Sequence, residues 1–231
     1  MKKINVKGPI IRSDDQWIYD YFEIEATSPK HVSKLIDEAA GDELEVEINS
    51  GGGDVFAGSE IYTALKSYKG NVTVKIVGLA ASAASVIAMA GKKVLMSPTA
   101  QMMIHNVSSM AAGDHRDMAH ASSVLKNAND TIANAYRLKS GKTQVELLSL
   151  MDQETWFTAQ QALENKLIDE VMFSDNIGLV ASYGATEILP PEVINKIRNS
   201  MKNPLGNDAD ILTLKKAEAT LKYYELIGGI K

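Results

Sequence analysis

The chain alternates strand-like and helix-like segments, and this alternation is the feature that most restricts its fold. Residues 43–49 alternate apolar and polar side chains as a half-buried strand does, and residues 71–78 are rich in β-branched residues. Each is followed by a segment with helical spacing, "VFAGSEIYTALKSY" after the first and "SAASVIAMAG" after the second. Repetition of this kind predicts an α/β fold with a mainly parallel sheet.

The later sequence continues the pattern around one long helix, which we predict over residues 114–139. Its apolar side chains recur at steps of three and four and form a narrow seam: Met118, Ala121, Leu125, Ala128, Ile132 and Ala135. The seam packs either on its own domain or on another copy of the chain. Shorter elements are predicted as strands in "KKVLMS", "QMMIHNV" and "IDEVMF", and as helices in "TQVELLSLM" and "TAQQALENKL".

The sequence changes character after Phe173. Pro190, Pro191 and the polar stretch 203–210 interrupt the pattern, and "ILTLKKAEATLKYYELI" then has amphipathic spacing. We therefore predict one domain over residues 1–175 and a C-terminal appendage with an amphipathic helix over residues 176–231.

Composition excludes several classes of function. The 231 residues are 45% hydrophobic and carry a net charge of −5 without a Lys/Arg cluster, which argues against a nucleic-acid surface. The absence of cysteine excludes disulfides and cysteine-based zinc sites and suits a cytoplasmic protein. The first 15 residues lack the apolar core of a signal peptide, and the longest low-charge run, 76–91, is too short to span a bilayer. We expect no cofactor, no resident metal and no membrane partner.

The stretch "VGLAASAASVIAMAG", residues 77–91, has only two side-chain polar groups, the hydroxyls of Ser82 and Ser85. Small residues beside a turn let another backbone approach closely, and a helix that begins near Ser82 directs free N–H groups toward that turn. The arrangement is similar to a strand–turn–helix nucleophile elbow, although alanines stand where the G-x-S-x-G pattern has glycines. The alternative is that Ser82 only caps the helix.

A nucleophilic serine needs a base, and the chain has four histidines. His115 and His120 fall among polar residues of the long helix and are expected to face solvent, and His31 lies at a predicted helix start. His105 ends the apolar run "QMMI", so a strand delivers it to the edge at which α/β folds place their sites. The alternative for His105 is a buried structural histidine.

The glycine-rich segment "NSGGGD", residues 49–54, directly follows a predicted strand. Such a loop can cradle a phosphate, but the Walker pattern is absent, because Tyr136 stands where the first glycine before "SGKT" is required. A loop whose backbone N–H groups bind a carbonyl oxygen is therefore the better interpretation.

These segments, in this order, resemble the Clp protease proteolytic subunit family over roughly residues 44–173. The similar segments are "INSGGGDVFAGSEIYTAL", "GLAASAASVIAMAG", "MMIHN" and "TWFTAQQALENKLIDEV". The resemblance implies the ClpP/crotonase-like α/β fold with repeated ββα units and a protruding helix. It also implies a serine endopeptidase with Ser82 as nucleophile, His105 as general base, and the amides of Gly53 and Ala83 as the oxyanion hole.

The third triad residue departs from the family, which has an aspartate where the aligned position is Glu154. Asp152, two residues earlier, is the alternative because side chains two apart on an extended segment share a face. Gly51 also replaces a family proline, and Lys166 replaces a usual glycine.

The resemblance further implies a homo-oligomeric ring, a hexamer or heptamer, single or as two stacked rings. The N-terminal segment and the extended C-terminus resemble the Clp-like proteases of phage and prophage head-gene clusters. That branch is thought to cut capsid or scaffold protein during prohead maturation, in the bacterial cytoplasm or at the prohead. The chain has no ATP site of its own, and the sequence neither requires nor excludes a Clp-type ATPase as a partner.

Three other functions compete with this one. A crotonase-type enzyme would use the paired amides on a coenzyme A thioester and would need no serine–histidine pair. A catalytically idle ring or scaffold protein would keep only the fold. A signal-peptide-peptidase-like protease would pair the serine with a lysine, for which Lys92 and Lys93 are the candidates.

Overall fold

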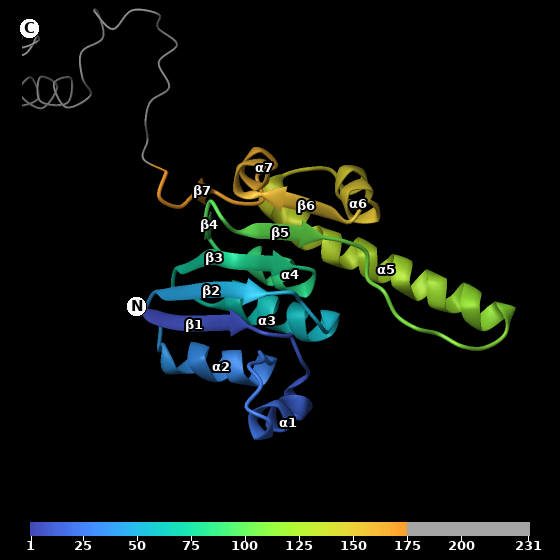
Figure 1. The fold of residues 1–231 in the computed structure, drawn as a ribbon, viewed down its shortest axis with the longest axis horizontal. Coiled ribbons are helices and arrows are strands. Elements are labelled where there is room, and N and C mark those ends of the chain that lie inside the picture. Colours follow the sequence, from blue (N-terminus) through green and yellow to red (C-terminus); the bar gives the residue numbers. More distant parts are fainter. Residues whose placement is uncertain (175–231) are drawn as a thin grey trace, which may run out of the picture. The chain divides into compact units, whose positions relative to one another are not determined.

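The computed structural model describes residues 1–174, as an α/β domain built on one sheet (Figure 1). The predicted C-terminal appendage and its amphipathic helix, residues 176–231, lie outside the described residues. Among the described residues, no helix is long and apolar enough to cross a membrane.

The sheet has seven strands, and β1, β2, β3, β4 and β7 follow one another across it. The bounds are β1 Lys2–Lys7, β2 Leu44–Ser50, β3 Val72–Ala81, β4 Lys93–Met96, β5 Gln101–Ile104, β6 Thr155–Thr158 and β7 Glu170–Val171. The long strand β3 pairs with β4 through residues 73–76 and with β5 through residues 79–81. Every pairing is parallel except β5 with β6, which confirms the predicted α/β fold with a mainly parallel sheet.

Within residues 1–174, seven α-helices connect or flank these strands. Their bounds are α1 Gln16–Tyr21, α2 Pro29–Glu38, α3 Val55–Ser67, α4 Ala83–Ala88, α5 His115–Ser140, α6 Gln144–Asp152 and α7 Ala159–Glu164. The side chain of Asp54 caps α3 by accepting from the Ala57 amide at 2.8 Å, and Asp114 and Asp117 form a capping box at the start of α5. Gly141, at φ 73°, ends α5 in the left-handed region.

The core lies between the sheet and the helices packed on it. Strand β2 buries every second residue, so that Leu44, Val46 and Ile48 are fully covered while the glutamates between them are half-buried. Helix α3 buries Ile61 and Leu65 against this layer. The two periodicities read from the sequence are therefore both satisfied around one core.

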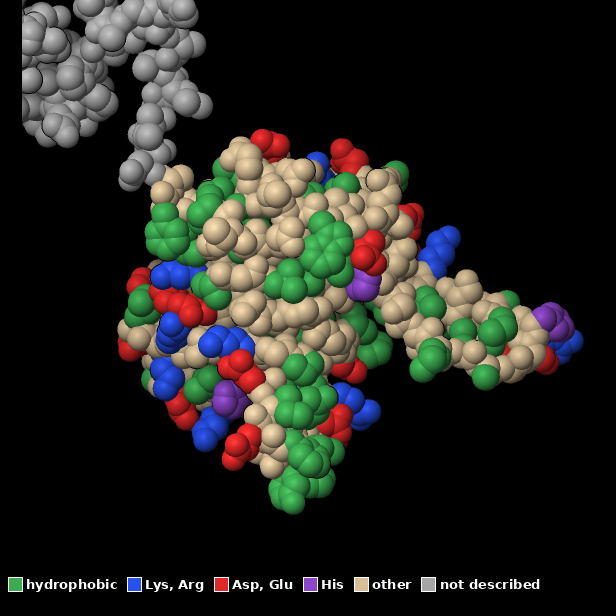
Figure 2. All heavy atoms as spheres, viewed as in Figure 1, with side chains coloured by type: hydrophobic (Ala, Val, Ile, Leu, Met, Phe, Trp, Pro, Cys, Tyr) green, Lys and Arg blue, Asp and Glu red, His purple; other side chains and the backbone are tan. Residues whose placement is uncertain are grey.

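Helix α5 confirms the predicted long helix, and its two halves differ sharply. The inner half buries Ile132, Ala135 and Tyr136, whereas the outer half carries exposed apolar side chains such as Met118 and Val124. Figure 1 shows this outer half extending away from the sheet, and Figure 2 shows hydrophobic side chains along it. The predicted seam therefore packs on its own domain only near the sheet.

Several elements were not predicted from the sequence. Strand β1 buries Ile4 and Val6 and adds a parallel strand beside β2, and α1 follows it, whereas for α2 a helix start near His31 was predicted. Strand β6 is only four residues long and ends where the predicted helix α7 begins. The alternation in "KINVK" is the signal that could have revealed β1.

Candidate active site

Ser82 occupies a sharp turn between a strand and a helix. Strand β3 ends at Ala81 and α4 begins at Ala83, so Ser82 alone makes the turn, with φ 53° and ψ −126°. A non-glycine residue rarely adopts this conformation, which costs about 1–3 kcal/mol and persists only where the surroundings impose it. Its side chain makes no capping hydrogen bond to α4. Ser82 therefore has the geometry of a nucleophile elbow and does not act as a helix cap.

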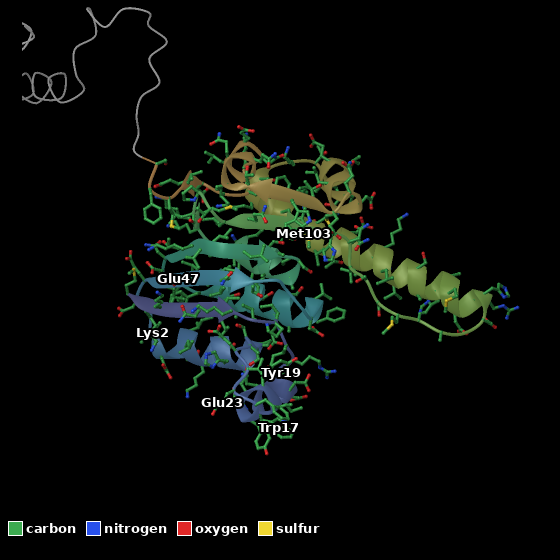
Figure 3. All side chains as sticks on the ribbon, in the orientation of Figure 1. Lys2, Trp17, Tyr19, Glu23, Glu47 and Met103 are labelled. Carbon is green, nitrogen blue, oxygen red and sulfur yellow. The ribbon has the colours of Figure 1, made fainter. Side chains whose placement is uncertain are left out.

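His105 reaches Ser82 because their strands are neighbours in the sheet. Strand β5 pairs with the last residues of β3, with Ala81 opposite Met103, and the Ser82 amide donates to the Met103 carbonyl at 3.0 Å. The label of Met103 in Figure 3 marks the end of β5, from which His105 follows two residues later. The His105 Nε2 atom lies 2.9 Å from Ser82 Oγ, which is hydrogen-bonding distance.

Of the two candidate acids, Glu154 lies toward the other side of the His105 ring. Its Oε2 atom is 3.8 Å from His105 Nδ1, and its side chain is 59% exposed. The indole N–H of Trp156 donates to the second oxygen of Glu154 at 3.4 Å. Asp152 instead accepts a 2.6 Å hydrogen bond from the Asn106 side chain. The antiparallel pairing of Ile104 with Thr155 brings the segment that carries both acids next to His105. The expectation that this segment is extended was wrong, because Asp152 ends α6 and Glu154 lies in a turn at φ 47°.

The glycine-rich turn after β2 lies directly against the Ser82 elbow. Gly52 has φ 95°, and a Cβ atom there would lie 2.7 Å from the Cβ of Ser82. Gly53 has φ 151°, and a Cβ atom there would lie 2.1 Å from the Ile10 carbonyl oxygen. Only glycine fits at these two positions, because a side chain would collide with the backbone of the neighbouring segment.

The two predicted oxyanion donors are the amides of Gly53 and Ala83. Each belongs to a peptide group whose carbonyl oxygen, on the other side of the plane, accepts a hydrogen bond. The Ile10 amide donates to the Gly52 carbonyl at 2.8 Å, and the Ser85 amide donates to the Ser82 carbonyl at 3.0 Å. In a trans peptide the N–H points away from the C=O of the same plane, so the amides of Gly53 and Ala83 point away from these partners. Neither amide donates a hydrogen bond within the described part of the chain.

A cavity of about 510 Å³ opens beside Ser82 and His105. It runs from the Gly53 turn to the inner half of α5, and its apolar lining includes Val86, Leu125 and Ile132. An apolar cavity beside a hydroxyl, an imidazole and two free amides can hold a side chain or a short extended chain next to the Ser82 hydroxyl.

The other titratable candidates lie away from this site. His31 is exposed at the start of α2, and His115 and His120 are exposed on α5. Lys92 donates to the Asn71 side chain at 3.0 Å, and Lys93 pairs with Glu170 at 2.6 Å. Within residues 1–174, no three His, Asp or Glu side chains are grouped so that they could hold a metal ion.

The fold and the site together define a Clp-like α/β protein with a serine–histidine pair at a nucleophile elbow. The sequence model of the Clp protease family matches residues 22–175, and the chain belongs to that family.

Similar proteins agree with this membership. The ATP-dependent Clp protease proteolytic subunit of Deinococcus radiodurans is 35% identical over 133 residues, which cover 56% of this chain and 65% of that protein. The subunit of the same name from Bacteroides fragilis is 32% identical over 134 residues, with 57% and 65% covered. The match therefore spans just under two thirds of the length of these relatives. A solved structure of a mutant ClpP1 from Listeria monocytogenes superposes with a TM-score of 0.62 at 21% identity and covers 74% of this chain and 91% of that one, which shows the shared fold.

Proposed function

We propose that the chain is a serine-type endopeptidase that hydrolyses peptide bonds through Ser82 and His105. The observation that carries the proposal is the 2.9 Å contact between Ser82 Oγ and His105 Nε2, beside the free amides of Ala83 in the elbow and Gly53 in the neighbouring turn. A serine becomes a nucleophile when a base within hydrogen-bonding reach accepts its proton.

The proposed mechanism is acyl transfer in two steps. His105 takes the Ser82 proton as the hydroxyl oxygen attacks the peptide carbonyl, and the amides of Gly53 and Ala83 bind the oxyanion. The protonated imidazole then gives its proton to the leaving amine. Water, activated by the same imidazole, hydrolyses the acyl-enzyme and restores the serine. Glu154 faces the Nδ1 side of the ring at 3.8 Å, too far for a hydrogen bond, and its negative charge stabilises the imidazolium that forms when His105 takes the proton.

Positions of other residues weaken the competing functions. A crotonase-type reaction would use the paired amides but leaves the serine–histidine contact without a role. A serine–lysine protease is disfavoured because Lys92 and Lys93 make their contacts with Asn71 and Glu170. An idle scaffold protein would not need Ser82 to keep a costly backbone conformation.

We further propose that the chain acts as a homo-oligomeric ring, a hexamer or heptamer, single or stacked in pairs. The exposed apolar side chains on the outer half of α5, Met118 and Val124 among them, support a contact with another copy. Substrates would then be flexible or unfolded protein segments that can enter an enclosed ring. The proposal neither requires nor excludes a Clp-type ATPase as a partner.

We also propose a narrower role, maturation of a phage or prophage prohead by cleavage of capsid or scaffold protein in the bacterial cytoplasm. Its support is the N-terminal segment, because the family match begins only at residue 22 and leaves both β1 and α1 outside. Incubation with purified phage capsid and scaffold proteins would test this role, with specific cleavage as the expected result and intact proteins as the result against it.

Acylation by a fluorophosphonate probe and hydrolysis of a fluorogenic peptide test the central proposal. Ser82→Ala and His105→Ala should each lower kcat by about 10⁶-fold, the loss seen when a nucleophile or base is removed from such a triad. The folded, assembled protein should remain, and exposed His31→Ala is the matched control that should keep activity. Near-normal hydrolysis by Ser82→Ala would refute the proposal.

A further inference from the structure

Two buried hydroxyl groups lie directly beneath the Ser82 elbow and have no role in the mechanism above. Ser85 belongs to the first turn of α4 and is 0% exposed, and Tyr136 belongs to the inner half of α5 and is 1% exposed. The Ser85 hydroxyl lies 2.6 Å from the Ser82 carbonyl oxygen and 2.8 Å from the Tyr136 hydroxyl. Residues that are 51 positions apart thus form a continuous chain of hydrogen bonds that ends on the backbone of Ser82.

The direction of this chain follows from counting hydrogens. A serine hydroxyl has one proton, and a carbonyl oxygen can only accept, so the proton of Ser85 goes to the Ser82 carbonyl. The Tyr136 hydroxyl must therefore donate to Ser85 Oγ. Burial raises the pKa of Tyr136 above its usual value, so its phenol keeps the proton that this donation needs.

The Ser82 carbonyl consequently accepts three hydrogen bonds, from the Ser85 hydroxyl and from the amides of Ser85 and Val86 at 3.0 and 3.3 Å. That carbonyl and the Ala83 amide belong to one planar peptide group. A set of donors that holds the oxygen on the core side therefore fixes the direction of the Ala83 N–H on the opposite side, toward the cavity.

We propose that Ser85 and Tyr136 are positioning residues that aim the Ala83 amide at the oxyanion through the Ser82–Ala83 peptide plane. The inference rests on the proposed peptidase function, because it gives the Ala83 amide its task. Tyr136 comes from α5, so the placement of that helix against the elbow sets the alignment of the donor.

A purely structural role is the poorer explanation of the pair. Phenylalanine in place of Tyr136 and alanine in place of Ser85 would fill the same space without any buried hydroxyl. Two buried hydroxyls must instead hydrogen-bond to each other, because one without a partner costs about 1–3 kcal/mol. The pair also ends on the one carbonyl whose peptide carries a predicted oxyanion donor, in a turn of unfavourable conformation that needs support.

The test compares Ser85→Ala, Tyr136→Phe and the double variant in the assembled protein. Loss of a whole oxyanion donor costs about 10²–10³ in kcat, so a misaligned donor should cost a part of that. We expect kcat to fall about tenfold in Ser85→Ala and about threefold in Tyr136→Phe, with KM unchanged. Affinity for a peptide aldehyde, whose adduct carries the oxyanion, should fall by the same factors.

The double variant separates positioning from stability. Ser85→Ala leaves the Tyr136 hydroxyl without a partner, so adding Tyr136→Phe should raise the urea midpoint while kcat stays at the level of Ser85→Ala. If kcat follows the urea midpoint across the three variants, or if KM rises with kcat unchanged, the positioning role is refuted.

A matched control removes a different buried hydroxyl from the same helix. Ser140 is 6% exposed and donates to the Tyr136 carbonyl at 2.7 Å without contact to the elbow. Ser140→Ala should lower stability but leave kcat and aldehyde affinity unchanged. Failure of the proposed function would appear as a wild-type protein that the fluorophosphonate probe does not acylate. If the wild type is acylated and both Tyr136→Phe and Ser85→Ala are as active as the wild type, the positioning role alone is refuted.

Discussion

The two sides of the His105 ring are built very differently. On the Nε2 side, Ser82 lies in a turn whose flanking residues Ala81 and Ala83 are buried and whose carbonyl accepts three hydrogen bonds. On the Nδ1 side, Glu154 is 59% exposed, lies 3.8 Å away and has one long hydrogen bond from Trp156.

This difference suggests a division of work between the two sides. Preformed, water-excluded dipoles contribute most to catalysis because they need no rearrangement when charge develops. An exposed carboxylate contributes less, because water screens its interaction with the imidazolium. We therefore expect substitutions on the Ser82 side to cost more activity than substitutions on the Glu154 side.

The largest effect in this comparison is expected for Gly53→Ala. The new Cβ atom would lie 2.1 Å from the Ile10 carbonyl oxygen, so the turn must move away from Ile10 and carry its amide out of line. We expect kcat to fall by about 100-fold or more and the free energy of unfolding to fall by about 2 kcal/mol. Peptide hydrolysis and urea unfolding measure the two effects.

Gly51 supplies the matched control from the same run of glycines. A Cβ atom at Gly51 would meet no atom within 4 Å, so Gly51→Ala should retain both activity and stability. If Gly51→Ala and Gly53→Ala lower kcat equally, the glycine run needs only backbone flexibility, and the direction of the Gly53 amide does not matter for catalysis.

The next effect is expected for Glu154→Gln. Glutamine keeps the size of the side chain but removes the negative charge that favours the imidazolium, and the same acid-to-amide change costs about 10⁴ in kcat where a buried triad acid holds the histidine tautomer. Because Glu154 is exposed and 3.8 Å away, we expect a smaller loss, about 30-fold, measured as kcat for the fluorogenic peptide.

Asp152→Asn tests the alternative acid. Asp152 accepts from the Asn106 side chain at 2.6 Å, so its substitution should change kcat by about twofold at most. A much larger loss in Asp152→Asn than in Glu154→Gln would transfer the role of triad acid to Asp152.

The smallest effect is expected for Trp156→Phe. This change removes the 3.4 Å hydrogen bond from the indole N–H to Glu154 and keeps an aromatic ring on β6. We expect kcat to fall about twofold, because the carboxylate loses one weak restraint. The same substitution in a Glu154→Ala background should have no effect on kcat, and an equal loss there would mean that Trp156 acts independently of the acid.

The main parts of the fold and the serine–histidine pair could be predicted from local patterns. Strands β2 and β3 have clear alternation or β-branched runs, and His105 ends an apolar run, which places it at the carboxyl edge of the sheet. Neighbouring parallel strands have their carboxyl ends at the same edge of the sheet. Ser82 and His105, which follow the ends of β3 and β5, are therefore close together once these two strands pair.

The remaining parts depend on packing that no local pattern records. Ser85 stood out in the sequence only as a second hydroxyl, and Tyr136 only as an interruption of a phosphate-loop motif. Their contact requires α5 to pass beneath α4, a tertiary arrangement set by the whole core. Only the family alignment separates Glu154 from Asp152 in the sequence, whereas in the structure Asp152 ends α6 and contacts Asn106, and Glu154 lies in the following turn at φ 47° and faces His105.

That register has a consequence for how the chain can vary in length. His105 follows Ile104 and Glu154 precedes Thr155, and these two neighbours are paired across antiparallel strands. One residue inserted between Glu154 and Thr155 would shift the carboxylate by about 3.3 Å along the strand, beyond the reach of the imidazole. The exposed residues 110–113 lie outside the ladder and outside the cavity, so the loop can lengthen or shorten there without moving either partner.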